Sequence, residues 1–462
     1  MAERFDVVVI GAGPGGFRAG KTCAQRGASV AVVEKEFIGG TCLNWGCIPS
    51  KALLASAHAL LSAKNADQIG VDVTSATPNW QKIQQRKDAI VAGFRKGMTG
   101  SAQANKIQLV RGRATVTAPG QIIVESDGGQ TEIEAGKIIL ATGSETMPLS
   151  AVPCDGQTVI TSKEALSLPK IPQSMVIVGG GVIGCEMACV YAAVGTKVTI
   201  VEALPRLLPM EDEWVGRLIE REFKKLSIDS VTSQKVTSVD KTTAPAQITL
   251  DNSQMIDAEK VLVSVGRRPT VDKETIDALN LQMDGSAIVI NEKLETNVPG
   301  VYAIGDVVGT TFLAHGATTE ADVAAANATG GDQKMTDYSL IPRVIFTFPE
   351  VASVGKSEEA CKSEGIDVSV GKGFFKANGR SVAHNDTAGQ VRAVRDSSTN
   401  KIVGITMVGA LSTELITLAR TLIGRGPDEL AQVTFPHPTV AETLEDAVKD
   451  AFGPAWRALA KS

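Results

Sequence analysis

The chain has 462 residues, 43% of them hydrophobic and 21% charged, a balance typical of a globular protein with several domains. A net charge of −5 argues against nucleic acid as a partner, because nucleic-acid-binding domains carry strongly basic surfaces. Residues 1–4 alone precede the first apolar run, and no segment is long and apolar enough to cross a bilayer. We therefore expect a cytoplasmic protein that binds neither nucleic acid nor membrane.

A β–α–β unit with a glycine-rich turn opens the chain. Residues 5–10 form a continuous apolar run, as in a strand buried on both faces, and Gly11-Ala-Gly13-Pro-Gly-Gly16 leads into a helical stretch. A second apolar run, residues 29–33, ends on Glu34. In a G-x-G-x-x-G turn the first glycine makes the turn, the second lets a pyrophosphate approach and the third lets the helix pack on the strand. The pattern predicts a dinucleotide site in which Glu34 accepts hydrogen bonds from ribose hydroxyls.

The same unit appears a second time. Residues 175–178, the turn Gly179-Gly-Gly181-Val-Ile-Gly184 and residues 197–201 repeat the order of strand, turn, helix and strand, and this copy ends on Glu202. The first glycine and the acid are 23 residues apart in both copies (34 − 11 and 202 − 179). Two copies predict two dinucleotides. The carboxylate of Glu202 favours NAD over NADP, because it would repel a 2′-phosphate.

The first copy is longer than the second. Residues 121–143 and 247–266 each read as a hairpin followed by a strand that closes on a glycine. The acid and the closing glycine are 109 residues apart in the first copy (143 − 34) and 64 in the second (266 − 202). The excess of 45 residues contains Gly39–Lys51, GGTCLNWGCIPSK. We therefore expect the first copy to hold a flavin beside this cysteine pair.

Cys42 and Cys47 differ in context from the other five cysteines, which we interpret as small buried hydrophobes. A zinc site would need further paired ligands, and none appear at suitable spacing. A structural disulfide is the stronger alternative, although a disulfide in the cytoplasm is more often catalytic or redox-sensing. A helix from Ser50 onward and a neighbouring cation would lower the thiol pKa, which would favour the reactive thiolate.

The remainder of the chain adds further candidates. Residues 145–153 read as a linker, and a strand over residues 301–304 runs into Gly305-Asp306, where Asp306 suits a ribitol hydroxyl. A helix that begins near Leu313-Ala314-His315 would direct its positive N-terminus at the flavin ring, although the side chain of His315 could instead fill a polar gap. From about residue 341, alternating strands and two late helices predict a separate C-terminal domain.

Dithiol exchange also needs a base, and histidine suits this role near neutral pH. His58 falls in an alanine-rich helix and His384 in a polar loop, so neither is expected to take part. His437 lies in HPTVAE, where Glu442 could orient its imidazole. The alternative is that Thr439-x-x-Glu442 is only a helix capping box, and the two interpretations are compatible.

With these motifs in place, the chain resembles the flavoprotein disulfide reductases over essentially its whole length, and within that family the members that oxidise dihydrolipoamide. GGTCLNWGCIPSKALL is a highly specific signature, and ATG, GD, LAH and HPTxxE follow in the family order. The resemblance implies an α/β fold with two Rossmann-like dinucleotide-binding domains, a duplicated three-layer fold, and a C-terminal α+β dimerisation domain. The expected boundaries are 1–149 for the FAD-binding domain, 150–271 for the NAD-binding domain, 272–340 for a central segment that completes the FAD domain, and 341–462 for the dimerisation domain.

The resemblance also assigns roles to single residues. Cys42 would form the mixed disulfide with the dithiol substrate, and Cys47 would face the flavin. Lys51 would lie near the flavin ring and pair with Glu186, which flanks the nicotinamide. The implied contacts are to one tightly bound FAD per subunit, through Gly11, Gly13, Gly16, Glu34, Gly40, Thr41, Cys42, Lys51, the backbone of Ala114, Thr142, Gly143, Asp306, Leu313, Ala314 and His315, and to NAD⁺, through Gly179, Gly181, Gly184, Glu186, Glu202 and Gly266, with no metal.

The implied reaction oxidises a dihydrolipoyl group to its disulfide and reduces NAD⁺ to NADH. Glu442 would orient His437 as the base, and both would come from the partner subunit of a homodimer. The dithiol would be the lipoyl arm of a 2-oxo-acid dehydrogenase or glycine-cleavage complex, or a free lipoyl carrier. The alternatives are an NADPH-dependent reductase of the glutathione reductase type and a redox-sensing flavoprotein scaffold.

Three positions depart from the family pattern. Phe435 stands where many members have a second histidine, which removes a polar neighbour of His437 and could alter the choice of lipoyl partner. Thr270 replaces a frequent asparagine and Cys185 a usual aliphatic residue. We interpret the last two as tolerated packing variation.

Overall fold

The computed structural model describes residues 3–335, 337–454 and 456, which form two compact units. Unit 1 contains the chain up to Ala52 together with Gln84–Met147 and Gly266–Tyr338. Unit 2 contains Leu53–Ile83, Pro148–Val265 and the chain from Ser339 onward. Each unit contains one of the two glycine-rich turns.

The sheet of unit 1 has seven strands in the order β3-β2-β1-β6-β5-β4, with β19 paired to β6. The strands β3-β2-β1-β6-β19 run parallel, and β4 and β5 extend this core as an antiparallel hairpin. The bounds are β1 Glu3–Ile10, β2 Val30–Glu34, β3 Gln108–Arg111, β4 Arg113–Ala118, β5 Gln121–Ser126, β6 Gly129–Leu140 and β19 Val301–Ala303, with a small pair β17 Met283–Asp284 and β18 Ala287–Ile288.

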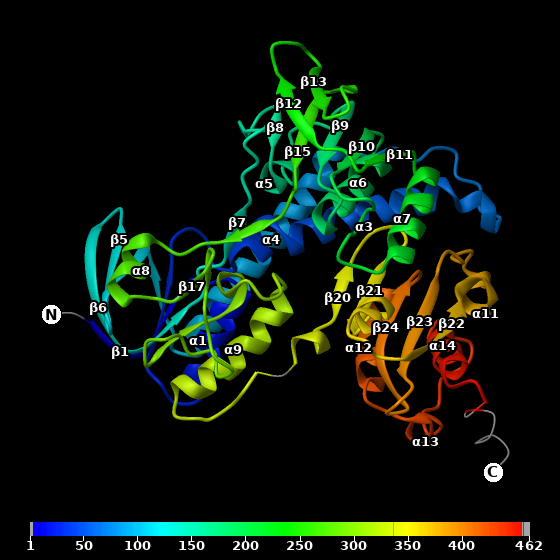
Figure 1. Cartoon of the computed structure of the whole chain (residues 1–462). Coiled ribbons are helices and arrows are strands. Elements are labelled where there is room, and N and C mark those ends of the chain that lie inside the picture. Colours follow the sequence, from blue (N-terminus) through cyan, green and yellow to red (C-terminus); the bar gives the residue numbers. More distant parts are fainter. Residues whose placement is uncertain (1–2, 336, 455, 457–462) are drawn as a thin grey trace. The chain divides into compact units, whose positions relative to one another are not determined.

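Both faces of this sheet are covered, which explains the continuous apolar run of β1. Val9 points into a cluster with α1 (Pro14–Gln25) and α9 (Ala314–Ala328), two helices that lie side by side in Figure 1. Val8 points to the opposite face, into a cluster with the β4–β5 hairpin and α8 (Lys273–Leu279). Alternate residues of one strand therefore belong to two separate cores.

The excess of the first copy folds largely into helices. α2 (Gly40–Trp45) carries Cys42, and α3 (Cys47–Lys64) begins in unit 1 and continues into unit 2. A 3₁₀ turn, η1 (Ala66–Ile69), follows it. α4 (Trp80–Ala104) then returns the chain to unit 1 and leads to β3.

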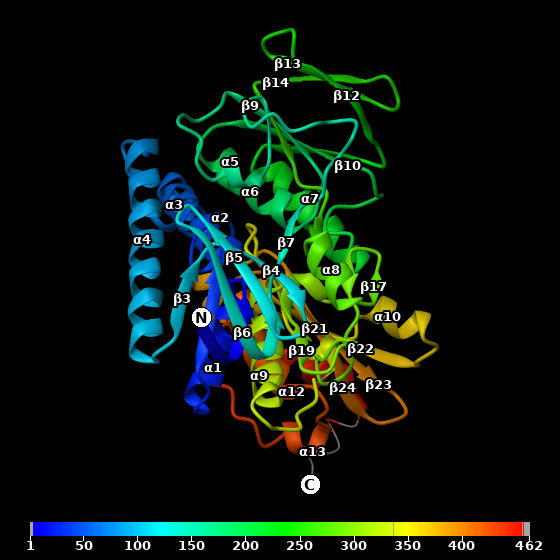
Figure 2. The ribbon, with the colours of Figure 1, turned by 90° about the vertical axis from the view of Figure 1, so that its left-hand side faces the viewer.

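In unit 2, the segment around the second glycine-rich turn forms a parallel sheet in the order β11-β10-β9-β15-β8. A separate antiparallel sheet of β12, β13 and β14 is seen at the top of Figure 2. The bounds are β8 Val159–Ile160, α5 Ser162–Ala165, β9 Ser174–Val178, α6 Val182–Ala193, β10 Lys197–Glu202, α7 Glu213–Lys225, β11 Ile228–Thr232, β12 Val236–Asp240, β13 Ala246–Leu250, β14 Met255–Ala258 and β15 Lys260–Val263.

The two copies share one strand order, β3-β2-β1-β6-β19 in unit 1 and β11-β10-β9-β15-β8 in unit 2, so the predicted duplication is confirmed. In unit 2 the hairpin and the closing strand are separate, as predicted, because the chain turns at Glu259, whose N–H donates to Oγ of Ser174 at 3.0 Å. In unit 1 this prediction is wrong. There β6 is a single strand of twelve residues that pairs first with β5 and then with β19.

The C-terminal part of unit 2 contains an antiparallel sheet in the order β20-β21-β24-β23-β22, with α12 and α14 packed in one core against it (Figure 1). A Cβ at Gly373 would lie 2.0 Å from the carbonyl oxygen of Thr443, so glycine is required where α14 crosses β22. The bounds are η3 Tyr338–Leu340, β20 Arg343–Ile345, β21 Val351–Gly355, α10 Glu358–Ser363, β22 Val368–Phe374, η4 Phe375–Ala377, α11 Gly379–Ala383, β23 Gln390–Asp396, β24 Lys401–Val408, α12 Ser412–Leu422, α13 Pro427–Leu430 and α14 Glu442–Phe452. The fold is therefore α/β, with two Rossmann-like parallel sheets and a C-terminal antiparallel domain, as predicted.

The predicted linker over residues 145–153 is wrong at its start. β7 (Ser144–Thr146) and β16 (Arg267–Pro269) form an antiparallel pair within unit 1, so Glu145 lies in a strand. The expected domain boundaries at 149, 271 and 340 stay predictions. Among the described residues, no helix combines the length and apolar character that a membrane crossing requires.

Candidate active site

The two glycine-rich turns have nearly the same geometry. Gly11 and Gly179 adopt φ values of +104° and +106°, and each donates its N–H to the second strand of its copy at 2.8 Å. A Cβ at Gly16 would lie 1.9 Å from the carbonyl oxygen of Gly11, and one at Gly184 would lie 2.1 Å from that of Gly179. Both turns therefore require glycine at their first and third positions.

The middle glycine of each turn faces open space. Gly13 and Gly181 are the N-caps of α1 and α6, and no other residue places an atom within 4 Å of where their Cβ atoms would be. The first N–H groups of a helix have no partner inside the helix and attract anions. The space and the donors fit the pyrophosphate of a dinucleotide at both turns.

Glu34 and Glu202 are held in the same way at the ends of their strands. Oε2 of Glu34 accepts the N–H of Ala12 at 2.8 Å, and Oε2 of Glu202 accepts the N–H of Gly180 at 2.6 Å. The other oxygen of each carboxylate accepts the N–H of the residue two positions further on. Glu202 is only 7% exposed. Each carboxylate is thus fixed where this motif places the adenosine ribose.

The cysteine pair lies on two successive helices. Cys42 is in α2, and Cys47 is the first residue of α3, which begins there rather than at Ser50 as predicted. A hydrogen bond with Cys47, burial and the charge of an ionised Cys47 raise the pKa of Cys42, and the opposing effect of the Lys51 ammonium is smaller. The predicted lowering of the thiol pKa is therefore wrong for Cys42. The raised pKa favours the protonated thiol of Cys42 in the dithiol form.

The residues predicted to contact FAD all lie in unit 1. Most of them lie at the carboxyl ends of the parallel strands and at the helix N-termini that follow them, which is where α/β folds bind ligands, whereas Ala114 lies in the antiparallel strand β4. Gly11, Gly13, Gly16 and Glu34 belong to the first copy, Gly40, Thr41 and Cys42 to α2, Lys51 to α3, Ala114 to β4, Thr142 and Gly143 to the segment after β6, Asp306 to η2 (Gly305–Val308), and Leu313, Ala314 and His315 to the start of α9.

Asp306 is held by two residues that the sequence analysis missed. The hydroxyl of Ser144 contacts Oδ2 of Asp306, and Nε of Arg267 donates to the Ser144 Oγ at 2.7 Å and lies 3.7 Å from Oδ2 of Asp306. Ser144 and Arg267 directly follow Gly143 and Gly266, and this equivalent position in the two copies is the signal that could have found them. They orient the carboxylate that we expect to bind the ribitol chain.

A fully buried carboxylate joins η2 to α9. Glu320, 0% exposed, accepts the N–H of Gly305 on Oε2 at 2.5 Å, and its Oε1 accepts the hydroxyls of Thr310 at 2.9 Å and Tyr338 at 2.8 Å. Burial raises the pKa of Glu320, and the charge of Asp306 adds to the rise. Glu320 therefore fixes the turn that presents Asp306.

His437 and Glu442 meet in unit 2. Nδ1 of His437 lies 2.9 Å from Oε1 of Glu442, and the N–H of Thr439 donates to Oε2 at 2.8 Å. These two hydrogen bonds lower the pKa of Glu442, with the Thr439 N–H as the larger cause. The Thr439 hydroxyl donates to the carbonyl oxygen of Pro436 instead of accepting a helix N–H, so half of the predicted capping box is present. The imidazole is 79% exposed, with its Nε2 available to an incoming group.

The remaining predicted residues are placed as follows. Glu186, 4% exposed in α6, accepts the N–H of Phe346 on Oε1 at 3.0 Å within unit 2, and its pairing with Lys51 stays a prediction. Gly266 lies in unit 1 and the other NAD candidates in unit 2.

The carbonyl oxygen of Thr270 accepts a hydrogen bond from the hydroxyl of Thr142 at 2.5 Å. No three His, Cys, Asp or Glu side chains among the described residues gather in a way that could hold a metal ion.

Four of the other five cysteines, Cys23, Cys185, Cys189 and Cys361, are buried as predicted. The prediction is wrong for Cys154, which is exposed in an irregular segment before β8. Burial raises the pKa of Cys23 and of Cys189 to about 12, which makes both thiols poor nucleophiles at neutral pH.

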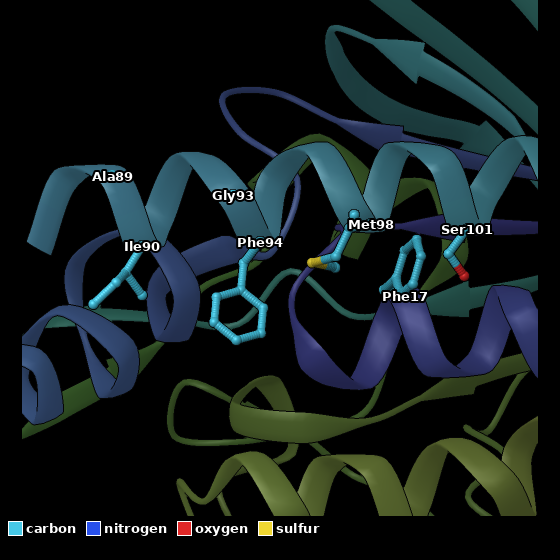
Figure 3. Close-up of a pocket in the computed structure, with 8 residues that line it drawn as sticks. Phe17, Ala89, Ile90, Gly93, Phe94, Met98 and Ser101 are labelled. Atoms are coloured by element: carbon cyan, nitrogen blue, oxygen red, sulfur yellow. The ribbon is translucent and has the colours of Figure 1, made fainter. Parts of the chain in front are cut away.

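An apolar groove of about 500 Å³ lies between α1 and α4 in unit 1. Figure 3 shows Phe17 rising from α1 toward α4, where Phe94 and Met98 line the opposite wall. The ring of Phe94 is 54% exposed. Arg95, the residue after Phe94 on α4, donates to Asn44, which lies between the two cysteines.

Two dinucleotide turns, a dithiol pair beside the first of them and a histidine–glutamate pair define an oxidoreductase that uses two dinucleotides and thiols. The chain matches the pyridine nucleotide-disulphide oxidoreductases over residues 5–326 and the dimerisation domain of the same proteins over residues 341–448. It belongs to this family, whose members bind FAD and a pyridine nucleotide. The dimerisation domain supports a homodimer.

Individual proteins match over nearly the full length. Dihydrolipoyl dehydrogenase from Bacillus subtilis is 37% identical over 457 residues, 98% of this chain and 100% of that protein, and the mitochondrial dihydrolipoyl dehydrogenase 1 of Arabidopsis thaliana is 36% identical over 96% and 90%. LpdA from Mycobacterium tuberculosis has a TM-score of 0.90 at 24% identity, over 97% of this chain and 99% of that one, which shows the shared fold. The HOCl-induced flavoprotein disulfide reductase RclA from Escherichia coli has a TM-score of 0.86 at 26% identity, over 96% and 99%.

Proposed function

We propose that this protein oxidises the dihydrolipoyl group of a lipoyl-bearing protein and passes the electrons through Cys42 and Cys47 to FAD and then to NAD⁺. The observation that carries the proposal is the cysteine pair itself, because Cys42 in α2 and Cys47 at the start of α3 belong to the segment that lies against the first dinucleotide turn. Relatives named dihydrolipoyl dehydrogenase support the choice of substrate.

The exchange step balances on the residues described. A substrate thiol gives its proton to His437 of the partner subunit and attacks Sγ of Cys42, so the Cys42–Cys47 bond breaks and Cys47 leaves as a thiolate. The second substrate thiol attacks the mixed disulfide, and Cys42 leaves as a thiol with the proton that the histidine held. The substrate closes to a cyclic disulfide, and its second proton stays on the histidine. Two electrons are then on the cysteine pair.

The cofactor and the base complete the reaction. FAD, when bound at the first turn, would supply a two-electron acceptor for the cysteine pair and a hydride donor for NAD⁺. Glu442 occupies Nδ1 of His437 and leaves Nε2 for the substrate proton. An exposed imidazole suits a base that acts on a second subunit, which supports the expected homodimer.

Two surfaces support the choice of substrate and nucleotide. The apolar groove of Phe17, Phe94 and Met98 suits the aliphatic part of a lipoyl arm. The fixed carboxylate of Glu202 at the second turn disfavours a 2′-phosphate, so NAD⁺ is preferred over NADP⁺.

A substrate panel tests the proposal. Purified protein should be yellow and should reduce NAD⁺ with dihydrolipoamide much faster than NADP⁺, with lipoyl domains tested as the natural form of the substrate. The variant His437→Gln tests the base. It should keep its FAD and lose about 10²-fold or more in dithiol turnover, as expected for a missing general base.

Two outcomes would contradict the proposal. NADPH-dependent reduction of glutathione disulfide without activity on dihydrolipoamide would assign a reductase of the glutathione reductase type. A flavoprotein that binds a lipoyl domain but turns over no dithiol would assign a redox-sensing scaffold.

A further inference from the structure

Asn44 lies between the two cysteines and is buried, with 8% of its surface exposed. Its Nδ2 donates to the carbonyl oxygens of Phe37 at 3.4 Å, Ile38 at 3.1 Å and Gly40 at 2.8 Å. One side chain thus joins α2 to the segment that precedes it. We call residues 37–47 the redox loop.

Arg95 on α4 contacts the redox loop in two places. Its Nε donates to Oδ1 of Asn44 at 2.5 Å, and its guanidinium carbon lies 4.1 Å from the centre of the Phe37 ring. The rings of Phe37 and Trp45 pack in an edge-to-face arrangement, with their centres 6.0 Å apart. A planar guanidinium can donate along its edge while its face covers a ring, which an ammonium cannot do. Arg95 therefore ties the loop to one helix at two points, Phe37 and Asn44.

The opposite side of the redox loop is fixed by backbone. The N–H of Gly39 donates to the carbonyl oxygen of Ala12 at 2.8 Å, and a Cβ at Gly40 would lie 2.7 Å from Cα of Gly13. The loop is thus seated on the first dinucleotide turn by close backbone contact. Its attachment to α4 depends on side chains, and these can be changed without disturbing the turn.

We propose that Arg95 and Asn44 are positioning residues that hold Cys42 and Cys47 in hydrogen-bonding contact and so keep the charge of the reduced pair on Cys47. The proposal rests on the redox role proposed for this pair. Loosening the clamp should let the two sulfurs separate, and an ionised Cys47 then loses the hydrogen bond that stabilises it. The predicted consequence is a thiolate that forms at higher pH and lies less well against the flavin.

The test uses the FAD-containing protein reduced by two electrons, with the long-wavelength thiolate–flavin absorbance followed against pH. Arg95→Met should move the midpoint of this absorbance up by about half to one pH unit and lower its plateau about twofold, with FAD content unchanged. Asn44→Asp should have the larger effect, because it loses all three bonds to carbonyl oxygens. Arg95→Lys should lie between Arg95→Met and the unmodified protein.

Lys96→Met is the matched control, because Lys96 is the next residue of α4 and is exposed. Midpoints and plateaus for Arg95→Met and Asn44→Asp that equal the Lys96→Met values would overturn the proposal. If the Asn44→Asp chain does not fold, Arg95→Met decides alone. If the unmodified protein itself develops no such absorbance on reduction, the redox role of the pair fails, which is a different result from a normal absorbance that Arg95 does not affect.

Discussion

The two glycine-rich turns share a frame but are covered by different segments. In unit 1 the redox loop lies over the turn, with Gly40 in close contact with Gly13. In unit 2 a leucine takes the place of the loop, and a Cβ at Gly180 would lie 2.4 Å from Cδ2 of Leu207. The glycines and the strand-ending glutamate are therefore placed alike in the two units, whereas the segment that covers each turn differs.

The strand that completes each parallel sheet differs as well. In unit 1 it is β19, which follows the copy in the chain, and in unit 2 it is β8, which precedes its copy. Both strands are followed by a backbone N–H that donates to a glutamate, Gly305 to Glu320 at 2.5 Å and Thr161 to Glu164 at 2.9 Å. Glu320 is fully buried, whereas Glu164 is half-buried. The same hydrogen bond therefore stands in two different dielectric environments.

The largest expected effect separates the two turns. Gly16→Ala forces a Cβ into the carbonyl of Gly11 and should abolish FAD retention, so the purified protein should be colourless or should fail to fold. Gly184→Ala makes the same clash in unit 2. The Gly184→Ala protein should stay yellow, but its KM for NAD⁺ should rise about 10²-fold, which corresponds to a loss of about 2.7 kcal/mol of binding free energy.

Gly100→Ala is the control, because its Cβ would meet nothing within 4 Å on α4. Absorbance at the flavin band and steady-state kinetics measure the effects. Loss of FAD in Gly184→Ala with normal NAD⁺ binding would contradict the assignment of the two turns.

A smaller effect is expected at the two strand-ending acids. Glu202→Gln removes the charge but keeps one acceptor oxygen, so the ratio of kcat/KM for NAD⁺ over NADP⁺ should fall about tenfold, corresponding to about 1.4 kcal/mol. Glu34→Gln should weaken FAD retention and leave this ratio unchanged. Equal ratios in the two variants would show that Glu202 does not select the nucleotide.

The smallest effect concerns how protein stability depends on pH at Glu320 and Glu164, the glutamates that accept the N–H groups after β19 and β8. Because burial raises the pKa of Glu320, the folded chain binds its proton at higher pH than the unfolded chain does. The resulting contribution to stability is complete below about pH 4.3, the ordinary glutamate value, and is lost as pH rises through the raised pKa. The Glu320→Gln protein does not lose stability in this way as pH rises, because an amide does not titrate. The hydroxyls of Thr310 and Tyr338 can rotate to hydrogen-bond the amide.

Thermal unfolding of both proteins from about pH 4 to pH 8 measures the difference. The melting temperature of Glu320→Gln minus that of the unmodified protein should increase with pH, by a few degrees at most. Glu164→Gln is the matched variant, and its difference should change much less. A difference for Glu320→Gln that falls with rising pH would reverse the sign of the argument.

Much of the frame could be predicted from the sequence, because its signals are local. The Val-rich runs mark strands buried on both faces, and the equal spacing of Gly11 to Glu34 and of Gly179 to Glu202 marks the duplication. The length of β6 could not be predicted, since the residues that join its two halves read as a break between strands. The exposure of Cys154 follows from tertiary packing and was missed for the same reason.

The supporting residues of the candidate site were the least predictable. Arg95 and Asn44 are 51 residues apart, and Glu320 follows Gly305 by 15, so no short motif contains either pair. The pKa of Cys42 depends on burial and on Cys47 as well as on nearby cations, which is why an argument from the helix end and Lys51 gave the wrong direction. The motif residues were found, whereas the contacts that orient them required the fold.

The strand pair β7–β16 has a consequence for how such a protein can change by recombination. Thr146 pairs with Arg267, and the N–H of Met147 donates to the carbonyl oxygen of Gly266 at 3.0 Å. The two ends of residues 148–265 are therefore held together by one antiparallel strand pair. A crossover that exchanged this excursion for a homologous one would leave the flavin-binding half joined at the same two points. The exchanged segment would also have to match Leu53, Leu54 and Trp80, which share its hydrophobic core.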